Sequence, residues 1–207
     1  MKRVFLPLLA LALLVGCSSE SSKPASEPAK PAVKEPEYET GRTAFQKLYV
    51  AAHGWARDAQ PYRLDSQTTQ DWNGKDGKSA VWRAAFGSAV QRGIKPYTWS
   101  GTNAQDAPER GVSPGSEDSY NPSNASTRVF DIAFFKIDSD KALDTAMKHG
   151  GDKLMQKDAK QPVVYSLDWN AGENALVWHI IFGTNRRDSK LVVMVNASNG
   201  NFIREEK

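Results

Sequence analysis

The chain has 207 residues, which is enough for one sizeable hydrophobic core or two small ones. Its formal charge is +3, and no run of five or more Lys or Arg residues occurs. This argues against a nucleic-acid-binding protein, because such surfaces need clustered cations to displace counterions. Cys17 is the single cysteine, so no disulfide can form within the chain and the fold must be stabilised by its core.

The N-terminus has the layout of a secretory signal. Lys2 and Arg3 give a positive start, and the uncharged apolar stretch at positions 4–16 is shorter than the roughly 18 to 20 residues of a membrane-spanning helix. The run Leu14-Val15-Gly16-Cys17 that follows resembles the lipobox of bacterial lipoproteins. The resemblance implies cleavage after residue 16 and diacylation of the Cys17 thiol, with a mature charge of +1 (+3 minus the two cations of the signal). The alternative is an ordinary signal peptide with an incidental cysteine.

Lipid attachment implies a location in the cell envelope, anchored to a membrane through several acyl chains on one cysteine. In lipoproteins the residue after the cysteine influences sorting, and an Asp there favours retention in the inner membrane. Ser18 therefore favours the outer membrane in a cell that has two membranes. Residues 17–40 are rich in Ser, Pro, Ala, Lys and Glu, and we expect them to form the lipidated start of a disordered tether.

The folded part contains an internal repeat at an offset of 96 or 97 residues (168 minus 71, 177 minus 81 and 182 minus 86). The short motifs Asp-Trp-Asn, Val-Trp and Phe-Gly occur in the same order in both halves. They start at positions 71, 81 and 86 and again at 168, 177 and 182. The pattern predicts two tandem repeats, the first over residues 41–100 and the second over residues 128–207.

In each repeat the sequence predicts a helix followed by three strands. Apolar spacings of three and four predict helices over 41–58 and 139–157, the second broken near Gly150-Gly151. Segments rich in β-branched and aromatic residues predict the strands 62–72, 79–86, 94–99, 163–169, 175–182 and 191–195. The fold class is therefore α+β, with two tandem repeats, each a helix packed on an antiparallel sheet of three to four strands.

Two segments lie outside this repeated pattern. Residues 128–137 are strongly apolar and predict an additional, central strand of the second repeat. Residues 101–127 are polar, and a loop of this length is usually either a functional loop or a mobile insertion.

The end of the chain, from Val193 to Ile203, resembles the closing hairpin of PepSY domains. In that family an apolar strand leads into a polar turn with Asp-Ala and Thr-Gly, whereas here the turn reads Asn196-Ala197 and Asn199-Gly200. With the preceding helix and strands, the resemblance covers residues 138–203. It implies a PepSY- or cystatin-like fold, an extracytoplasmic location and a protein- or peptide-binding module that is not itself an enzyme.

The sequence lacks the common catalytic motifs. The three histidines, His53, His149 and His179, do not have a metal-binding spacing, and neither a Gly-x-Ser-x-Gly elbow nor a glycine-rich phosphate loop occurs. We therefore expect no metal, no cofactor and no catalytic residue. Asp71 and Asp168 hold equivalent repeat positions and are a conceivable pair of catalytic carboxylates, although Asp near such a turn usually accepts hydrogen bonds from it.

Two of the six tryptophans are candidates for ligand contact. Trp82 and Trp178 fall inside apolar strands, where core packing is the simplest role. The two candidates, Trp72 and Trp169, fall at strand ends beside asparagines, where a half-exposed indole supplies a large rigid contact surface. The candidate ligand-binding residues are Trp72, Asn73, Trp169 and Asn170. The alternative is that the two indoles only shield the edges of the sheet.

The leading hypothesis is a lipid-anchored, non-enzymatic envelope protein that binds, and in one version inhibits, a protein or peptide. One alternative is an envelope hydrolase that uses Asp71 or Asp168 with a histidine. Another is a glycan or cell-wall binding module that uses Trp72 and Trp169 with the loop 101–127. The sequence leaves open the identity of the partner and the oligomeric state.

Overall fold

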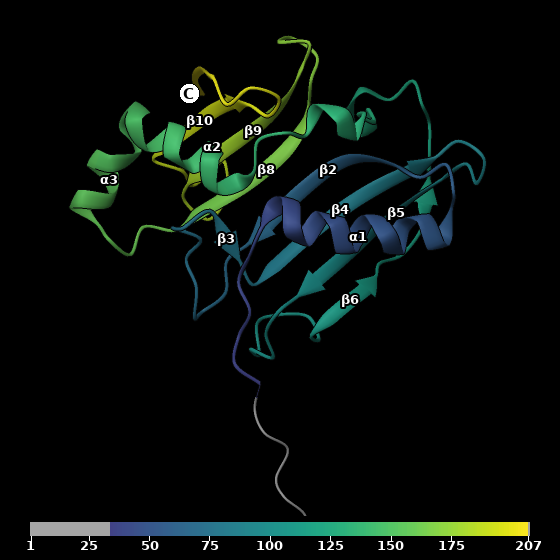
Figure 1. Ribbon diagram of the computed structural model, residues 1–207, viewed down its shortest axis with the longest axis horizontal. Helices are drawn as coiled ribbons and strands as arrows, with labels where there is room; N and C mark the ends of the chain where they lie inside the picture. The colour runs from purple at the N-terminus through teal and green to yellow at the C-terminus, as the bar shows by residue number, and fades with distance from the viewer. Residues whose placement is uncertain (1–33, 207) are drawn as a thin grey trace, which may run out of the picture. The chain divides into compact units, whose positions relative to one another are not determined.

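One antiparallel sheet of nine strands forms the framework of residues 34–206, the part of the chain that the computed structural model describes (Figure 1). The strand order is β11-β10-β9-β8-β2-β4-β5-β6, and β7 also pairs with β5. A separate short pair joins β1 to β3. The strands are β1 Glu39–Thr40, β2 Gln60–Gln67, β3 Lys78–Ser79, β4 Val81–Ser88, β5 Gly93–Ser100, β6 Gly111–Pro114, β7 Asp118–Ser119, β8 Val163–Asn170, β9 Ala175–Phe182, β10 Leu191–Asn196 and β11 Phe202–Glu206. The predicted signal peptide and the lipidation site at Cys17 lie outside the described residues.

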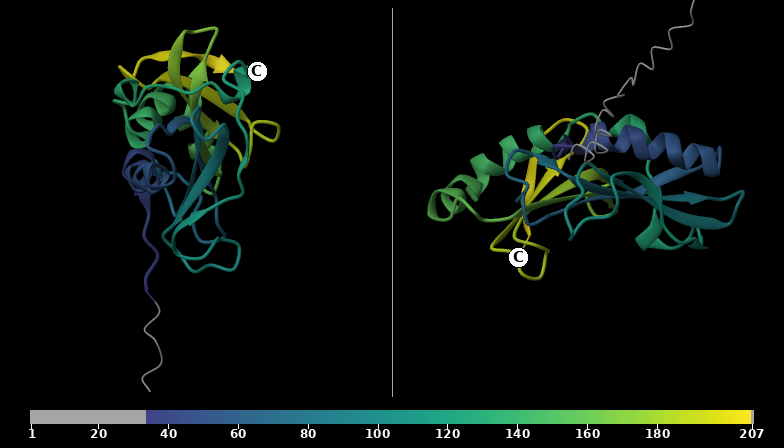
Figure 2. Two further views of the ribbon diagram at one scale, coloured as in Figure 1. Left: turned by 90° about the vertical axis from the view of Figure 1, so that its right-hand side faces the viewer. Right: turned by 90° about the horizontal axis from the view of Figure 1, so that it is seen from below.

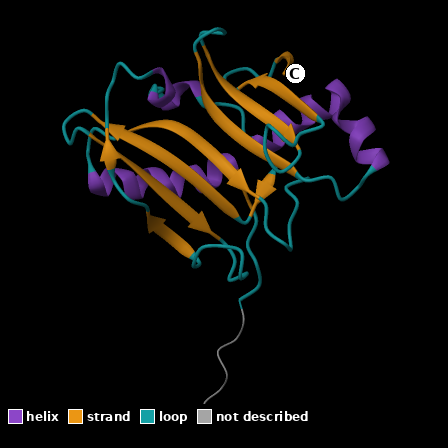
Figure 3. Cartoon of the chain, turned by 180° about the vertical axis from the view of Figure 1, so that it is seen from behind, coloured by secondary structure: helices purple, strands orange, loops and turns teal. Residues whose placement is uncertain are grey.

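The helices α1, α2 and α3 lie on one face of this sheet (Figures 2 and 3). We call the other face, which carries no α-helix among residues 34–206, the helix-free face; of the helical segments, only the short 3₁₀ turn Ala125–Thr127 reaches it, where Ala125 lines a hollow with His179. The bounds of the helices are α1 Gly41–Trp55, α2 Ser139–Ala146 and α3 Asp152–Lys157, with an irregular turn at Met147–Gly151 between α2 and α3. Gly150 has φ +99° there, so the break predicted at the paired glycines is confirmed. No helix among residues 34–206 has the length and apolar character to cross a membrane.

Helix α1 forms because its apolar residues recur every three or four positions. Ala44, Phe45, Leu48 and Ala52 are at most 5% exposed and face the sheet. The helix ends at Trp55, slightly earlier than the predicted end at residue 58.

The N-termini of α1 and α2 meet at one carboxylate. Asp138 Oδ1 accepts hydrogen bonds from the backbone N–H groups of Ser139 (2.7 Å) and Arg42 (2.8 Å), and Oδ2 accepts one from the Thr40 hydroxyl (2.6 Å). The Ser139 hydroxyl accepts a further bond from the N–H of Gly41 at 2.8 Å. Because N–H groups at the start of a helix have no partner within it, Asp138 and Ser139 cap both helices.

Two tryptophans fill the centre of the core beneath these helix ends. Trp82 of β4 and Trp178 of β9 are fully buried and pack edge to face, with ring centroids 6.3 Å apart. Their Nε1–H groups donate to the carbonyls of Glu39 and Ile137, each at 2.9 Å. A side chain at Gly41 would place Cβ 2.7 Å from the Trp178 ring, so the close approach of α1 requires glycine there. The prediction that both tryptophans belong to the core is confirmed.

The strands of the two halves join edge to edge into a single sheet. Helix α1 precedes β2, β4 and β5, while α2 and α3 precede β8, β9 and β10, which is the order predicted for each half. Strand β2 pairs with β8 through Arg63–Asp168, Leu64–Leu167 and Asp65–Ser166. The sequence predicted a separate small sheet in each half, but pairing the first strands of the halves removes two exposed edges.

The closing hairpin forms where the sequence predicts it. Strands β10 and β11 pair antiparallel, and Gly200 N–H donates to Asn196 O at 2.8 Å with Gly200 at φ +79°. Asn196 also accepts the N–H of Ser198 through its side chain at 2.8 Å. The asparagine and glycine thus make the turn that the pattern indicates.

Residues 128–137 form no strand, so that prediction is wrong. The Asp131 carboxylate accepts a hydrogen bond from the Ala133 N–H at 2.8 Å and starts a short 3₁₀ turn. Such a local bond gives the backbone an alternative to a strand ladder. The segment packs beside α1 instead, with the Phe135 and Phe45 ring centroids 5.4 Å apart.

The predicted polar loop 101–127 also contains regular structure. Strands β6 and β7 both pair with the outer edge of β5 and so satisfy part of its backbone. Strand β6 has four residues and β7 has two, which is too few to give a strand signal in the sequence.

Residues 34–40, which the sequence assigns to the tether, pack against the sheet domain. Tyr38 stacks on Trp72 with ring centroids 4.3 Å apart, and the Glu37 N–H donates to Gly101 O at 2.9 Å. The Arg110 guanidinium donates to the carbonyls of residues 34 and 35. The polar composition of this segment hides these contacts, because most of them use its backbone.

Candidate functional site

The first predicted pair, Trp72 and Asn73, lies in the loop after β2. The Trp72 Nε1–H donates to Lys78 O at 2.9 Å, and its ring is half-buried against Tyr38. The Asn73 carbonyl accepts the N–H of Val163, the first residue of β8, at 2.7 Å. Both residues therefore hold this loop against the sheet.

The second predicted pair, Trp169 and Asn170, lies at the end of β8. Trp169 packs edge to face on Phe134 with centroids 5.5 Å apart, and the Arg128 guanidinium lies 5.4 Å from its ring centroid. Asn170 Oδ1 accepts the N–H of Glu173 at 3.0 Å, which closes the predicted turn before β9. The Trp169 indole N–H is buried without a hydrogen-bond partner in the described part of the chain.

The structure does not bring these two pairs together. Asn73 contacts the first residue of β8, and Asn170 is the last residue of that strand. Since an antiparallel strand rises about 3.4 Å per residue, the seven steps from residue 163 to residue 170 place the pairs roughly 24 Å apart. One small ligand therefore cannot touch both tryptophans.

The predicted histidines and carboxylates also lie apart, with one exception. His53 contacts a carbonyl of its own helix, and His149 stacks on an aromatic ring of β11. Within residues 34–206 no three His, Cys, Asp or Glu side chains are grouped as metal ligands. Asp71 is exposed in its loop, whereas Asp168 contacts His179.

Four charged or titratable side chains meet on the helix-free face of the sheet, and we call them the His179 cluster (Asp168, His179, Arg186 and Glu206). Trp178 and its neighbours at alternate positions of β9 belong to the helix-side core, so His179 points to the opposite face. Its Nε2 lies 3.3 Å from Asp168 Oδ1 and its Nδ1 lies 3.3 Å from Glu206 Oε1. The second contact has ion-pair distance without the alignment of a hydrogen bond. The imidazole is only 1% exposed.

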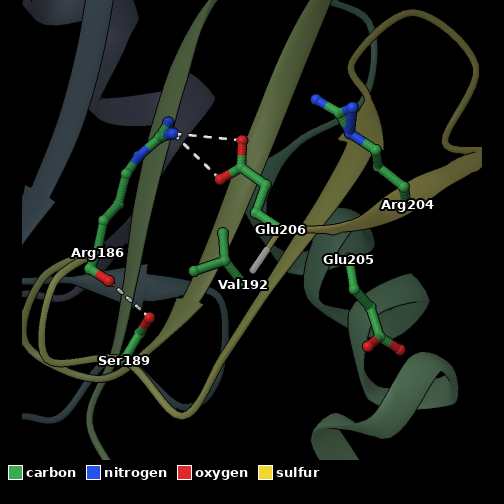
Figure 4. A pocket seen from close by; sticks show the side chains of 6 residues that line it. All are labelled: Arg186, Ser189, Val192, Arg204, Glu205 and Glu206. Atoms are coloured by element: carbon green, nitrogen blue, oxygen red, sulfur yellow. Dashed lines mark hydrogen bonds and ion pairs between the residues drawn. The ribbon is translucent and has the colours of Figure 1, made fainter.

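Arg186 completes the cluster from the loop 183–190 that connects β9 to β10. Its Nη1 lies 3.1 Å from Glu206 Oε2, and its Nη2 lies 3.8 Å from Asp168 Oδ2. The Ser189 hydroxyl donates to the Arg186 carbonyl at 2.8 Å and steadies the loop (Figure 4). Each carboxylate thus faces both the imidazole and the guanidinium.

The electrostatics of the cluster favour a charged imidazole. Burial disfavours the charged ring, but Asp168 and Glu206 outweigh it and raise the pKa of His179. The contact with His179 in turn lowers the pKa of Glu206. Burial opposes ionisation of Asp168 as well, yet His179, Arg186 and Arg63 keep the pKa of its carboxyl below the usual value.

Three shallow hollows open around the cluster, and Arg186 lines all of them. They measure about 580, 560 and 430 Å³. The first lies beside β11 with Arg204 and Glu206 (Figure 4), the second lies over β2 with Arg63 and Asp65, and the third lies over His179 itself. Side chains of both charges lie close together in these hollows.

Sequence reasoning singled out Asp168 but missed Arg186 and Glu206. His179 lies 11 positions from Asp168, and β11 is separated from β9 by β10, so only the register of four strands brings the cluster together. The one available signal was a histidine inside the otherwise apolar β9 sequence Ala-Leu-Val-Trp-His-Ile-Ile-Phe.

Comparison with known proteins gives one likeness in fold. No protein-family model matches the chain, and no curated protein is significantly similar to it. The resemblance to PepSY domains therefore gains no support from that comparison. The fold is similar to the crystal structure of the "putative lipoprotein (CD1622)" from Clostridium difficile 630, with a TM-score of 0.54 and 12% identity. The match covers 83% of this chain and 95% of that one, and at this identity it shows the fold alone: a mixed α/β arrangement with a large antiparallel sheet and few helices.

Proposed function

We propose that this chain is a lipid-anchored protein of the cell envelope that binds a protein or peptide without catalysing a reaction. The anchor rests on the lipobox-like run that ends at Cys17, and it agrees with the description of the structural neighbour. Three finer features of the proposal rest on the sequence alone. They are two PepSY- or cystatin-like repeats, an inhibitory action on the partner, and location in the outer membrane through Ser18.

The binding role rests on one observation, the three adjoining hollows that share Arg186 on the helix-free face. Charged side chains surround the hollows, and Val164, Ile181 and Val192 supply apolar surface beneath them. Polar and apolar groups that lie close together on a rigid sheet suit a peptide with mixed side chains.

Strand β11 extends this surface to the margin of the sheet. It is the terminal strand, and its outer edge is unpaired among residues 34–206. An extended peptide can add to such an edge through main-chain hydrogen bonds, and its alternate side chains then enter neighbouring hollows. The hollow beside Arg204 and Glu206 is the nearest to that edge.

The surroundings of His179 favour binding over catalysis. A general base needs a free ring nitrogen, but both nitrogens of this imidazole face carboxylates. The raised pKa of His179 favours the protonated ring, which cannot accept a further proton. We therefore assign the cluster to holding the loop 183–190 and the C-terminal strand in place beside the hollows.

In-cell crosslinking of the full chain, followed by affinity capture and mass spectrometry, tests this proposal. We expect a reproducible envelope partner that is lost with Arg186→Ala and with Cys17→Ser. Lys157→Ala, a change at an exposed position of α3, is the control and keeps the partner. Melting temperatures of the purified variants confirm that they are folded. Capture of no partner, or of the same partner by the Arg186→Ala protein, contradicts the proposal.

Hydrolysis is a second candidate function, because Asp168 lies 3.3 Å from His179. In this alternative the imidazolium acts as the acid and the carboxylate orients it. Assays with ester, peptide and glycoside substrates distinguish the two candidates. Turnover by the wild type that Asp168→Asn abolishes favours the hydrolase, whereas a captured partner without turnover favours binding.

A further inference from the structure

The helix-covered side of the fold carries exposed apolar side chains beside cations, and we call this surface the α1 patch (Arg42, Val50, Ile132, Phe134 and Lys136). Five large apolar side chains are exposed in the described part of the chain, and three of them lie here. They are 73% (Val50), 42% (Ile132) and 45% (Phe134) exposed. A gathering of apolar groups on a surface marks a site of interaction more often than single exposed residues do.

The patch is built by α1 and the 3₁₀ turn at 132–134. Val50 and Ile132 lie on opposite sides of a hollow of about 250 Å³ between these two elements. The floor of the hollow is aromatic and consists of Phe45, Tyr49 and Phe135. Arg42 Nη1 donates to Lys136 O at 3.1 Å and ties the start of the helix to the end of the turn.

The charges at the patch are mainly positive. Arg42 and Lys136 are exposed, Arg128 lies beyond the other end of the turn, and none of the three forms an ion pair among residues 34–206. Helix α1 contains no acidic residue. The one carboxylate of the turn, Asp131, accepts the Ala133 N–H at 2.8 Å. At the start of α1 a second carboxylate, Asp138, accepts the Arg42 N–H at 2.8 Å. Three cations against the two carboxylates of Asp131 and Asp138 leave a net positive surface around the apolar side chains.

We propose that the α1 patch contacts the anionic phospholipid surface of the membrane. Interfacial segments insert apolar side chains about 5–10 Å into the headgroup region, while neighbouring Lys and Arg side chains meet anionic headgroups. Val50 and Ile132 line the hollow and are nevertheless exposed, and Phe134 of the same 3₁₀ turn is exposed beside it while it packs on Trp169. Apolar side chains that are exposed at the surface in this way favour a bilayer surface over a peptide. The proposal does not require lipidation of Cys17, although an anchor would raise the local concentration of the patch at the membrane.

Cosedimentation with vesicles tests the proposal without the anchor. The protein is the mature chain, residues 17–207, with Cys17→Ser so that no acyl chain is present. The vesicles contain phosphatidylcholine alone or an equal mixture with phosphatidylglycerol. We expect binding to the anionic vesicles that weakens as salt is added, because salt screens the attraction between the cations and the headgroups.

Two valines form a matched pair of test variants. Val50 is 73% exposed in the patch, and Val90 is 77% exposed in the turn between β4 and β5, beyond the far end of α1. We expect Val50→Glu to weaken vesicle binding and Val90→Glu to leave it unchanged. Arg42→Gln combined with Lys136→Gln should lower the partition coefficient about thirtyfold, since each basic side chain near a membrane contributes about fivefold.

Three outcomes overturn the proposal, provided that melting temperatures show folded variants. They are the absence of binding to anionic vesicles, equal binding by the two glutamate variants, and equal binding to vesicles with and without phosphatidylglycerol. If the protein does not bind vesicles and Val50→Glu instead abolishes crosslinking to an envelope protein, the patch is a protein-docking surface. Failure of the vesicle test leaves the partner captured through Arg186 unaffected, so the two proposals fail independently.

Discussion

Replacing His179 with glutamine removes the positive charge at the centre of the His179 cluster. The imidazole is 1% exposed, with its two nitrogens 3.3 Å from Asp168 and Glu206. Removing one partner from a buried ion pair costs about 3–5 kcal/mol. The side chains of Asp168 and Glu206 are 26% and 21% exposed and keep their contacts with Arg186. We therefore expect a smaller loss in the free energy of unfolding, about 2–3 kcal/mol near pH 6. A domain of this size would then melt roughly 4–12 °C lower.

The loss should depend on pH with a defined sign. The pKa of His179 is raised in the fold, so its contribution is complete below the unfolded pKa of about 6.5 and is lost as pH rises through the folded pKa. The pKa values of Asp168 and Glu206 are lowered, so their contributions are present above about pH 4 and are lost as pH falls through the folded pKa values. The cluster therefore stabilises most between about pH 4.5 and 6.5.

Urea unfolding of both proteins over a series of pH values measures this effect. We expect the difference in free energy of unfolding between wild type and H179Q to shrink from about pH 6 to about pH 9, with equal denaturant slopes. A difference that stays constant over this range would refute a charged imidazole between the carboxylates.

Three further predictions concern the fold. Tyr165→Phe should lower the free energy of unfolding by about 1–3 kcal/mol, because the buried hydroxyl bonds a carbonyl and an N–H of the loop 73–77; an unchanged urea midpoint would mean that this loop is not held by Tyr165. Asp138→Ala should cost about 2–4 kcal/mol in the same assay, since one carboxylate caps two helices, and a loss below about 1 kcal/mol would count against the shared cap. Deleting residues 18–33 should leave the melting temperature of the mature chain unchanged. Deleting residues 18–40 should lower it by more than about 4 °C, because the contacts of residues 34–40 are then lost. Equal melting temperatures of the two deletion variants would show that these contacts stabilise the fold little.

The local elements were predictable because each has a signal within a few residues. The three- and four-residue spacing of α1 and the alternating or continuous apolar character of β4, β8 and β9 depend on short-range patterns alone. The glycine break after α2 and the Asn-Gly turn before β11 likewise follow from single residues that adopt positive φ or bond their own backbone.

The remaining features depend on contacts distant in sequence. The hydrogen bond of Asp131 that starts a 3₁₀ turn in place of a strand gives no signal in the sequence, because an aspartate can also occupy an exposed position of a strand. The pairing of β2 with β8 leaves no separate mark in either strand, because two small sheets and one large sheet need the same apolar pattern. Glu206 lies three residues beyond the predicted closing hairpin, which ends at Ile203, and only the register of β8 to β11 places it beside His179.

Site-specific photocrosslinking in living cells tests most directly whether the helix-free face binds a partner. A photoreactive amino acid replaces Arg187, which is exposed and lines the hollow over β2, or Val90, which is 77% exposed away from that face. We predict a crosslinked envelope protein or peptide from position 187 and none from position 90. The same products from both positions, or no product from position 187, would contradict a binding role for the helix-free face.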